Sequence, residues 1–264
     1  MTNKLQDKVA IVFGAGSVGE GWGNGKASAV AYARAGAKVV AVDIQQAAAD
    51  ATRDIIGSEG GEAISVGANV TALDDVRRAV DEAVKAFGRI DILHNNVGIT
   101  SQGGPVETSE EVWDRVMTVN VKSMFLTCKC VLPLMEEQGS GVITNISSLA
   151  SVRWTGYAYS AYYASKGAVN MFTKGLAIQY APKGIRSNCI LPGLMDTPHI
   201  YQQISGFYKD VGEMVEARHK LSPTGRMGDG WDIANAAAFL ASDDAKFING
   251  IELLVDGGMH VRCG

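Results

Sequence analysis

The sequence predicts an α/β fold: one domain built on a doubly wound parallel sheet of about seven strands, with helices on both faces. Short β-branched runs alternate with alanine-rich helical stretches along the whole chain, which is typical of stacked βαβ units. The chain has 264 residues, of which 47% are hydrophobic, so it can bury one large core. A glycine-rich loop joins the first β-branched run to the first helical stretch.

Each element follows from this alternation, taken in chain order. The β-branched runs predict strands at Lys8–Phe13, Lys38–Asp43, Glu62–Gly67, Ile90–Asn95, Gly141–Ser147, Ile185–Leu191 and Gly250–Val255. The stretches between them predict helices near Gly25–Ala35, Gln46–Gly57, Leu73–Phe87, Ser109–Glu137, Ala161–Tyr180 and Trp231–Ala241. Pro198–Leu221 stands outside the alternation, so we expect an excursion over the sheet, with a substrate loop at about 194–221.

Composition excludes several classes of function. The net charge of -4 and the absence of a basic run argue against a nucleic-acid partner. The apolar stretch Val9–Phe13 is too short for a signal core or a membrane span, so we expect a soluble, cytoplasmic protein without a membrane partner. The four cysteines lack paired metal-ligand spacing, so we expect reduced thiols and no metal site.

Tyr162 and Lys166 stand four residues apart in a stretch with helical periodicity. That spacing places both side chains on one face of a helix. An ammonium held there favours phenolate over phenol, so a group with a reference pKa of about 10 can act as a base closer to neutrality. Taken alone, the pair favours a surface tyrosine beside a solvated lysine over a catalytic pair.

The glycine-rich loop has two possible registers. It contains Gly14-x-Gly16-x-x-Gly19, the dinucleotide fingerprint of Rossmann-type folds. A helix starting inside that motif would carry several glycines in its first turns, each costing up to ~1 kcal/mol relative to alanine, so we interpret the match as coincidental. The alanine-rich periodicity begins at Gly25, so we expect the helix N-terminus near Gly23–Gly25, with Gly19 and both of these glycines facing the phosphates. A flexible loop without a ligand is the alternative.

Asp43 ends the second predicted strand, about twenty residues beyond Gly23. A carboxylate there can accept hydrogen bonds from both ribose hydroxyls of NAD and would repel the 2′-phosphate of NADP. The next residue is Ile44, not the arginine or lysine that NADP favours. Aspartate at a strand end is also a common turn former. The sequence therefore favours NAD as the cofactor.

With these features together the chain resembles the short-chain dehydrogenase/reductase superfamily from Lys8 to Met259. Several further motifs carry this resemblance. They are Asn95-Asn96-Val97-Gly98, Asn120 within Val116–Lys122, Ser148 within Asn145–Leu149, the Tyr162/Lys166 pair, Pro192-Gly193 with Thr197, and Val255–Gly258. Ser147 is a neighbour that could be confused with Ser148.

The resemblance implies hydride transfer between an NAD nicotinamide and a secondary alcohol or its ketone, without a metal. It implies the catalytic set Asn120, Ser148, Tyr162 and Lys166. It also implies cofactor contacts from Gly14, Gly19, Gly23, Gly25, Asp43, Asn69, Val70, Asn96, Gly98, Tyr162, Lys166, Pro192, Gly193 and Thr197. Members of the family are often tetramers, so we expect a homotetramer built with the predicted helices Ser109–Glu137 and Ala161–Tyr180.

Some departures and alternatives remain open at this stage. The loop from Gly14 to Gly23 is longer than the family's usual spacing, and Asn69 replaces an expected aspartate, although its amide oxygen could bind an adenine amino group. The runner-up function is an NADPH-dependent ketoreductase, including the 3-oxoacyl-thioester type. A dinucleotide-binding regulator without turnover is the alternative outside enzymes.

Other residues have two interpretations. We expect His94 to be a packed, neutral side chain rather than a catalytic one. Arg153 could bind a substrate carboxylate or be solvated, and His199 could belong to a lid. Specificity is expected from Gln102–Pro105, Leu149–Tyr159 and Leu194–Leu221, whose relative placement periodicity does not give.

Overall fold

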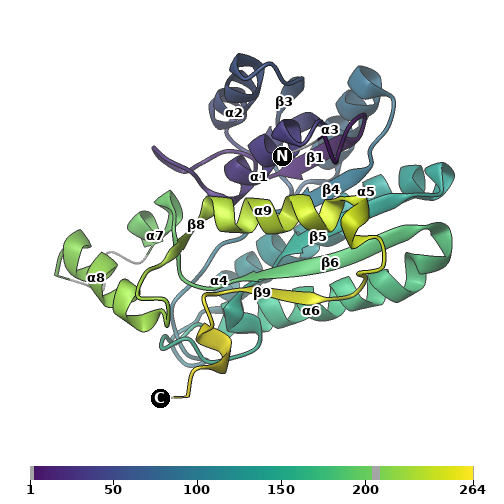
Figure 1. Ribbon diagram of the computed structural model, residues 1–264. Helices are drawn as coiled ribbons and strands as arrows, with labels where there is room; N and C mark the ends of the chain where they lie inside the picture. The colour runs from purple at the N-terminus through teal and green to yellow at the C-terminus, as the bar shows by residue number, and fades with distance from the viewer. Residues whose placement is uncertain (1–2, 204–208, 264) are drawn as a thin grey trace.

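The computed structural model describes residues 3–203 and 209–263, and one parallel sheet of seven strands forms its centre (Figure 1). The strand order is β3-β2-β1-β4-β5-β6-β9, and every neighbouring pair is parallel. The strands are β1 (Val9–Phe13), β2 (Lys38–Asp43), β3 (Ala63–Gly67), β4 (Ile92–Asn95), β5 (Gly141–Ile146), β6 (Ile185–Pro192) and β9 (Glu252–Val255). The predicted fold class is confirmed, and the strand ends shift by one or two residues.

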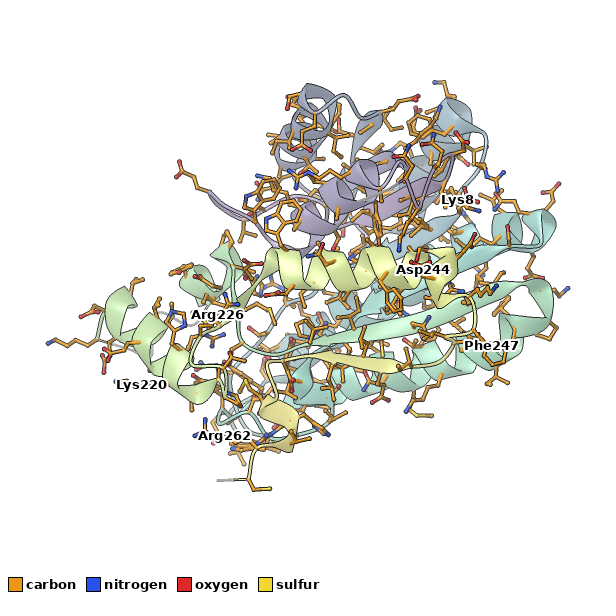
Figure 2. All side chains as sticks on the ribbon, viewed as in Figure 1. Lys8, Lys220, Arg226, Asp244, Phe247 and Arg262 are labelled. Carbon is orange, nitrogen blue, oxygen red and sulfur yellow. The ribbon has the colours of Figure 1, made fainter. Side chains whose placement is uncertain are left out.

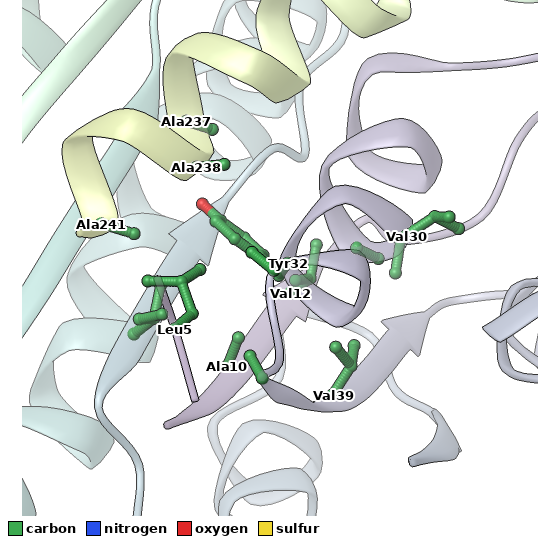
Figure 3. Close-up of a cluster of buried hydrophobic side chains, with 14 of the residues drawn as sticks. Leu5, Ala10, Val12, Val30, Tyr32, Val39, Ala237, Ala238 and Ala241 are labelled. Carbon is green, nitrogen blue, oxygen red and sulfur yellow. The ribbon is translucent and has the colours of Figure 1, made fainter. Parts of the chain in front are cut away.

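Helices cover both faces of this sheet because successive strand residues point to opposite sides. In β1, Ala10 and Val12 join a core cluster with α1, α2 and α9, whereas Ile11 and Phe13 join a second cluster with α3, α5 and α6. Figure 3 shows part of the first cluster, in which Tyr32 lies between the β1 side chains and α9. These helices are α1 (Asn24–Arg34), α2 (Gln46–Ser58), α3 (Leu73–Phe87), α5 (Ser123–Gln138), α6 (Ser160–Tyr180) and α9 (Gly230–Ala241).

The predicted helix Ser109–Glu137 is confirmed as one continuous helical stretch, but it contains a π turn that was not predicted. Ser109 caps α4 (Glu110–Met117), a π-helical turn follows at Thr118–Lys122, and α5 continues from Ser123. A π turn inserts one extra residue into a helix without interrupting it, so the whole stretch still has the composition of a single helix. The turn matters for the site because it contains Asn120.

The excursion predicted after the sixth strand forms short elements beyond the sheet edge. They are β7 (Met195–Asp196), α7 (Pro198–Gln203), α8 (Val211–Leu221) and β8 (Gly228–Asp229), with β7 paired to β8. Residues 204–208 of the expected substrate loop lie outside the described part of the chain. In Figure 1, α7 and α8 project past the carboxyl ends of β6 and β9, close to the C-terminus.

Candidate active site

A cavity of about 870 Å³ opens at the carboxyl ends of the strands. Its lining comes from the segments that follow β1, β2, β3, β4, β5 and β6, together with α8 and the C-terminal turn. The strand order reverses between β1 and β4, and ligands of open α/β sheets bind at such a switch point. The sheet topology therefore places this cavity where a ligand site is expected.

The turn after β1 brings backbone close to backbone. Gly14 has a φ of +81°, and a Cβ on Gly25 would lie 1.9 Å from the Gly14 oxygen, so neither position accommodates a larger side chain. Gly23 is the N-cap of α1 and no side chain caps the helix, so its first N–H groups remain for a ligand. The predicted start of this helix is confirmed.

Neither of the two predicted registers of the glycine loop matches the full set of glycines that line the cavity. Gly14, Gly23 and Gly25 line the cavity, whereas Gly19 does not and lies exposed near Pro198. Gly16, which the sequence analysis set aside, lines the cavity in its place. The extra residues of the long loop thus carry Gly19 away from the site, which spacing alone does not reveal.

Asp43 holds its carboxylate at the edge of this turn. Its Oδ2 accepts a hydrogen bond from the Gly16 N–H at 3.0 Å, and its Oδ1 accepts one from the Gln45 N–H at 3.0 Å. The neighbouring lining residues Ile44, Gln45 and Ala48 carry no charge. The end of β2 therefore presents a fixed anion without an adjacent cation among these three.

Asn69 and Val70 follow β3 and both line the cavity. The Asn69 Oδ1 accepts hydrogen bonds from the N–H and the hydroxyl of Thr71, at 3.0 and 2.8 Å. This amide oxygen was expected to bind an adenine amino group, but it accepts hydrogen bonds from Thr71 instead. The amide nitrogen, a donor, is the group that remains for a ligand.

The segment after β4 contacts both the turn at Gly14 and the Lys166 side chain of α6. Asn96 donates from Nδ2 to the Gly14 oxygen at 3.0 Å. A Cβ on Gly98 would lie 3.2 Å from the Lys166 Nζ and 3.5 Å from the Asn120 Oδ1, so glycine lets these groups approach. Asn96 and Gly98 both line the cavity.

Pro192, Gly193 and Thr197 line the cavity from the end of β6. A Cβ on Gly193 would lie 2.7 Å from the Cα of Asp256, so the close approach of the closing motif requires glycine here. Thr197 is buried.

Lys166 lies on α6 with its ammonium buried beneath the cavity floor. Its Nζ donates to the Ile146 oxygen at 2.9 Å and lies 5.6 Å from the centre of the Tyr162 ring. Burial lowers the pKa of Lys166 to about 8. Both residues line the cavity, so the spacing of four places them on one face of the helix as expected.

The pKa of Tyr162 differs in direction from the sequence-based expectation. Burial raises it, and a hydrogen bond with Ser148 acts in the opposite direction. The Lys166 ammonium donates to the Ile146 carbonyl, and burial disfavours its own charged form. Spacing predicted the pair correctly but not the desolvation around it.

The two adjacent serines after β5 have different surroundings. Both serines line the cavity. Ser147 is buried, and its hydroxyl donates to the Asn170 Oδ1 at 2.6 Å. Ser148 accepts a hydrogen bond from the Ala150 N–H at 3.1 Å. The Ser147 proton is thus engaged within the protein, which favours Ser148 as the serine that meets a ligand.

Asn120 lies behind the cavity and does not line it. Its Oδ1 accepts from the Ile99 N–H at 2.8 Å, and its Nδ2 donates to the Ile99 oxygen and to the Ser165 Oγ, both at 2.9 Å. The π turn thus fixes the segment after β4 against α6, three residues from Tyr162.

Aromatic side chains enclose the remaining part of the cavity. Trp154 stacks on Tyr163 with ring centres 5.5 Å apart, and Tyr157 stacks on Tyr159 at 5.3 Å. Trp154, Tyr157 and Tyr159 line the cavity, and so does His199. The Tyr163 hydroxyl holds this loop by donating to the Tyr157 oxygen at 2.9 Å.

Sequence reasoning missed several lining residues. Arg115, Arg218, Met259 and Arg262 line the cavity but reach it from segments far apart in the chain. Arg153 lines it and donates to the Met259 oxygen. No local motif announces any of these positions, because they converge only through the tertiary fold.

His94 is fully buried, as expected. Its Nδ1 pairs with the Tyr32 hydroxyl at 2.8 Å, and burial lowers its pKa to about 3. Within the described residues, no group of three or more His, Cys, Asp or Glu side chains is arranged to hold a metal ion. None of the described helices has the length and apolar character that a membrane crossing needs.

Comparison with known proteins decides the family. A family model described as Enoyl-(Acyl carrier protein) reductase matches residues 19–260. The chain belongs to the short-chain dehydrogenase/reductase superfamily. It is 40% identical to the 2-(R)-hydroxypropyl-CoM dehydrogenase of Xanthobacter autotrophicus, over 95% of this chain and 97% of the relative.

Two further similarities agree with this membership. The chain is 38% identical to the cyclohexanol dehydrogenase of an Acinetobacter species, over 97% of this chain and 96% of the relative. A solved structure described as a short-chain dehydrogenase/reductase from Burkholderia xenovorans aligns with a TM-score of 0.93 and 44% identity, covering 99% of both chains. These similarities therefore establish that the protein is an oxidoreductase of this superfamily.

Proposed function

We propose that the protein is an NAD-dependent oxidoreductase that interconverts a secondary alcohol and its ketone. The observation that carries this proposal is that Tyr162, Ser148 and Lys166 line the same cavity as Asp43 and the Gly14 turn. The similarity to relatives named as cyclohexanol dehydrogenase and 2-(R)-hydroxypropyl-CoM dehydrogenase supports an alcohol as substrate.

The coenzyme end of the cavity fits a dinucleotide of the NAD type. The close backbone approach of Gly14 and Gly25 leaves room for a pyrophosphate beside the uncapped N-terminus of α1. Asp43 presents a carboxylate that suits two ribose hydroxyls and disfavours a 2′-phosphate. The holding set would be Gly14, Gly16, Gly23, Gly25, Asp43, Asn69, Val70, Asn96, Gly98, Tyr162, Lys166, Pro192, Gly193 and Thr197.

The residues of this chain then share the chemistry of proton transfer. When bound, the nicotinamide supplies the acceptor of the hydride in oxidation and its donor in reduction. Ser148 hydrogen-bonds the substrate oxygen, and Tyr162 as phenolate accepts the hydroxyl proton of the alcohol or, as phenol, returns it to the ketone. Because burial raises the pKa of Tyr162, the phenolate depends on nearby positive charge, for which Lys166 is the nearest source in the chain.

Lys166 and Asn120 support this step. The Lys166 ammonium would hold the nicotinamide ribose while it stabilises the phenolate. Asn120 keeps the Ile99 segment and α6 in place and lies where it could order a water that carries the proton outward. Its described hydrogen bonds are all to protein groups, so a water would be bound by a backbone group of the π turn or by Lys166.

The phenolic hydroxyl provides the direct test. We expect Tyr162→Phe to lower kcat for cyclohexanol oxidation by roughly 10²- to 10⁴-fold, because the base is lost, while the Kd for NAD changes little. NADH formation and calorimetric NAD binding measure the two effects. Tyr180→Phe, at the far end of the same helix, serves as the control and should leave turnover intact. Undiminished turnover in Tyr162→Phe would end the catalytic assignment.

Two alternatives remain proposals of lower standing. An NADPH-dependent ketoreductase would show a clear preference for NADP, contrary to the role given to Asp43. A dinucleotide-binding regulator would bind NAD without turnover of any alcohol, and the cavity-lining Tyr162 and Ser148 argue against it. We further propose a cytoplasmic homotetramer, supported by the exposed apolar stripe on α6 formed by Ala164, Met171, Gly175 and Ile178.

A further inference from the structure

The charges around the cavity are distributed unevenly. Asp43 is the one carboxylate among the described lining residues, and it stands at the coenzyme end. Arg153, Arg218 and Arg262 line the cavity where α8 and the C-terminal turn meet. In Figure 1, α2, which follows Asp43, lies at the top of the molecule, and α8, which carries Arg218, lies at its lower left.

Arg218 is the buried member of this group, with 4% of its surface exposed. It lies on the inner face of α8, where its Nε contacts the Met227 sulfur at 3.3 Å beside the buried Met214. A guanidinium that is shielded from water interacts more strongly with an oxyanion than an exposed one does. Its five N–H donors allow protein partners and a ligand to be held together.

The position of Arg218 relates it to the catalytic tyrosine. Its charge acts on the phenol of Tyr159, where it partly opposes the rise in pKa caused by burial. The Tyr159 ring in turn lies edge-on to the Tyr162 ring, with centres 6.1 Å apart. Arg218, Tyr159 and Tyr162 all line the one cavity, so a single substrate can contact both the buried cation and the base.

Neighbouring arginines reinforce this end of the cavity. Arg153 donates to the Met259 oxygen, and Arg262 donates to the Leu221 oxygen at 3.0 Å. These hydrogen bonds go to neutral carbonyl groups, so they fix the loop after β5, α8 and the C-terminal turn around the cavity mouth. Figure 2 shows Arg262 on the α8 side of the molecule, near Lys220 and far from Asp244.

We propose that the substrate is an anionic secondary alcohol, a hydroxy acid whose oxyanion is bound by Arg218 while its carbinol lies against Tyr162 and Ser148. The proposal rests on the proposed function and adds the class of substrate. The aromatic walls at Trp154 and Tyr157 favour an apolar body, such as a ring, between the carbinol and the oxyanion. A carboxylate is the simplest oxyanion of this kind, and its two oxygens match the fork of a guanidinium.

Matched acid and ester substrates test this assignment. The probes are 3-hydroxycyclohexanecarboxylate and its methyl ester, which differ in charge but share the carbinol. We expect wild-type kcat/KM with NAD to favour the acid by roughly ten- to hundredfold. In Arg218→Gln the ratio should approach one, and in Arg218→Lys part of it should return. Because the ratio compares two substrates on one enzyme preparation, a lower active fraction does not change it.

Arg226→Gln is the matched control. Arg226 is an exposed arginine near α8 that does not line the cavity, so the acid-to-ester ratio should stay at its wild-type value (Figure 2). Equal loss of the ratio in both variants would mean that general surface charge, and not Arg218, selects the acid. That result would overturn the assignment of Arg218.

A binding measurement separates this inference from the proposed function. Calorimetric titration of the protein with cyclohexanecarboxylate and with cyclohexanecarboxamide should show tighter binding of the acid, and Arg218→Gln should remove the difference. If neutral alcohols are oxidised and the acids are neither oxidised nor bound, the inference is wrong and the proposed function stands. If no alcohol is oxidised but the acid binds through Arg218, the proposed function is wrong and the anion site stands.

Discussion

His94 shows how a single buried side chain sets the acid stability of the fold. Its ring pairs with the Tyr32 hydroxyl, while its Nε2 is buried without a hydrogen-bond partner, and burial lowers its pKa from 6.5 to about 3. The unfolded chain therefore binds a proton at this position between about pH 6.5 and 3, and the folded chain does not. Stability rises with pH across this window and is lost as the pH falls through it.

We predict that His94→Gln flattens this pH dependence. The wild type should lose up to about 1.4 kcal/mol of unfolding free energy per pH unit below 6.5 through this residue alone, and the variant should lack that contribution. Urea unfolding at pH 7, 6 and 5 measures the slope. His260→Gln, an exposed histidine, is the control and should keep the wild-type slope. Identical slopes in all three proteins would contradict the assignment.

Asp43 is the residue on which the proposed preference for NAD depends. We predict that Asp43→Ser lowers kcat/KM with NAD by roughly ten- to hundredfold, because the acceptor for the ribose hydroxyls is lost, and raises the ratio of NADP to NAD activity. Parallel kinetics with both cofactors measure the change. Asp74→Asn, an exposed aspartate on α3, should change neither value. An unchanged cofactor ratio in Asp43→Ser would remove the basis for the NAD proposal.

The first helix and the turn before it act as one element because two glycines touch. We predict that Gly25→Ala destabilises the fold by about 1–3 kcal/mol or more, since its Cβ would lie 1.9 Å from the Gly14 oxygen. NAD binding should weaken with it, because the same turn lines the cavity. Unfolding by urea and calorimetric NAD titration measure both effects.

Gly57 provides the comparison for Gly25. It lies in α2, where an added Cβ meets no atom within 4 Å. Gly57→Ala should therefore stabilise the fold by about 0.5–1 kcal/mol through helix propensity and leave NAD binding unchanged. A similar loss of stability in both variants would show that helix context, and not the contact with Gly14, causes the effect at Gly25.

The helices and strands that follow a regular apolar pattern were predicted well. The π turn and the glycine loop, where extra residues alter the backbone, were predicted poorly. The β-branched runs predicted all seven strands of the sheet, and glycine costs predicted the start of α1. The π turn around Asn120 leaves the stretch with the composition of a single helix, so the sequence showed one helix. The long glycine loop placed Gly16, and not Gly19, at the cavity, a result of loop geometry that composition does not encode.

At the scale of the whole molecule, the sequence predicts the motifs of the proposed catalytic residues but not the arginines at the proposed substrate end. Ser148, Tyr162 and Lys166 fall in one motif or in neighbouring segments, so their meeting followed from the family resemblance. Arg153 and Arg218 come from a loop and from α8, and only the folded chain places both on one cavity. The positive charge at the proposed substrate end therefore could not be predicted from the sequence. Arg153 alone was named there as a possible partner of a substrate carboxylate.

Assembly is the last property that follows from the molecule as a whole. On α6, the residues Ala164, Met171, Gly175 and Ile178 lie exposed on one stripe, and Met171 and Ile178 expose 65% and 79% of their surface. Small and apolar residues at helical spacing suit a helix packed against its copy.

We predict a tetramer by mass photometry, and Ile178→Glu should dissociate it because each contact across a twofold axis would bury two opposed carboxylates. Phe247→Glu, at a fully exposed site in the loop before β9, tests whether that loop also contributes to the assembly (Figure 2). Wild-type protein that is monomeric at micromolar concentration would refute the assembly.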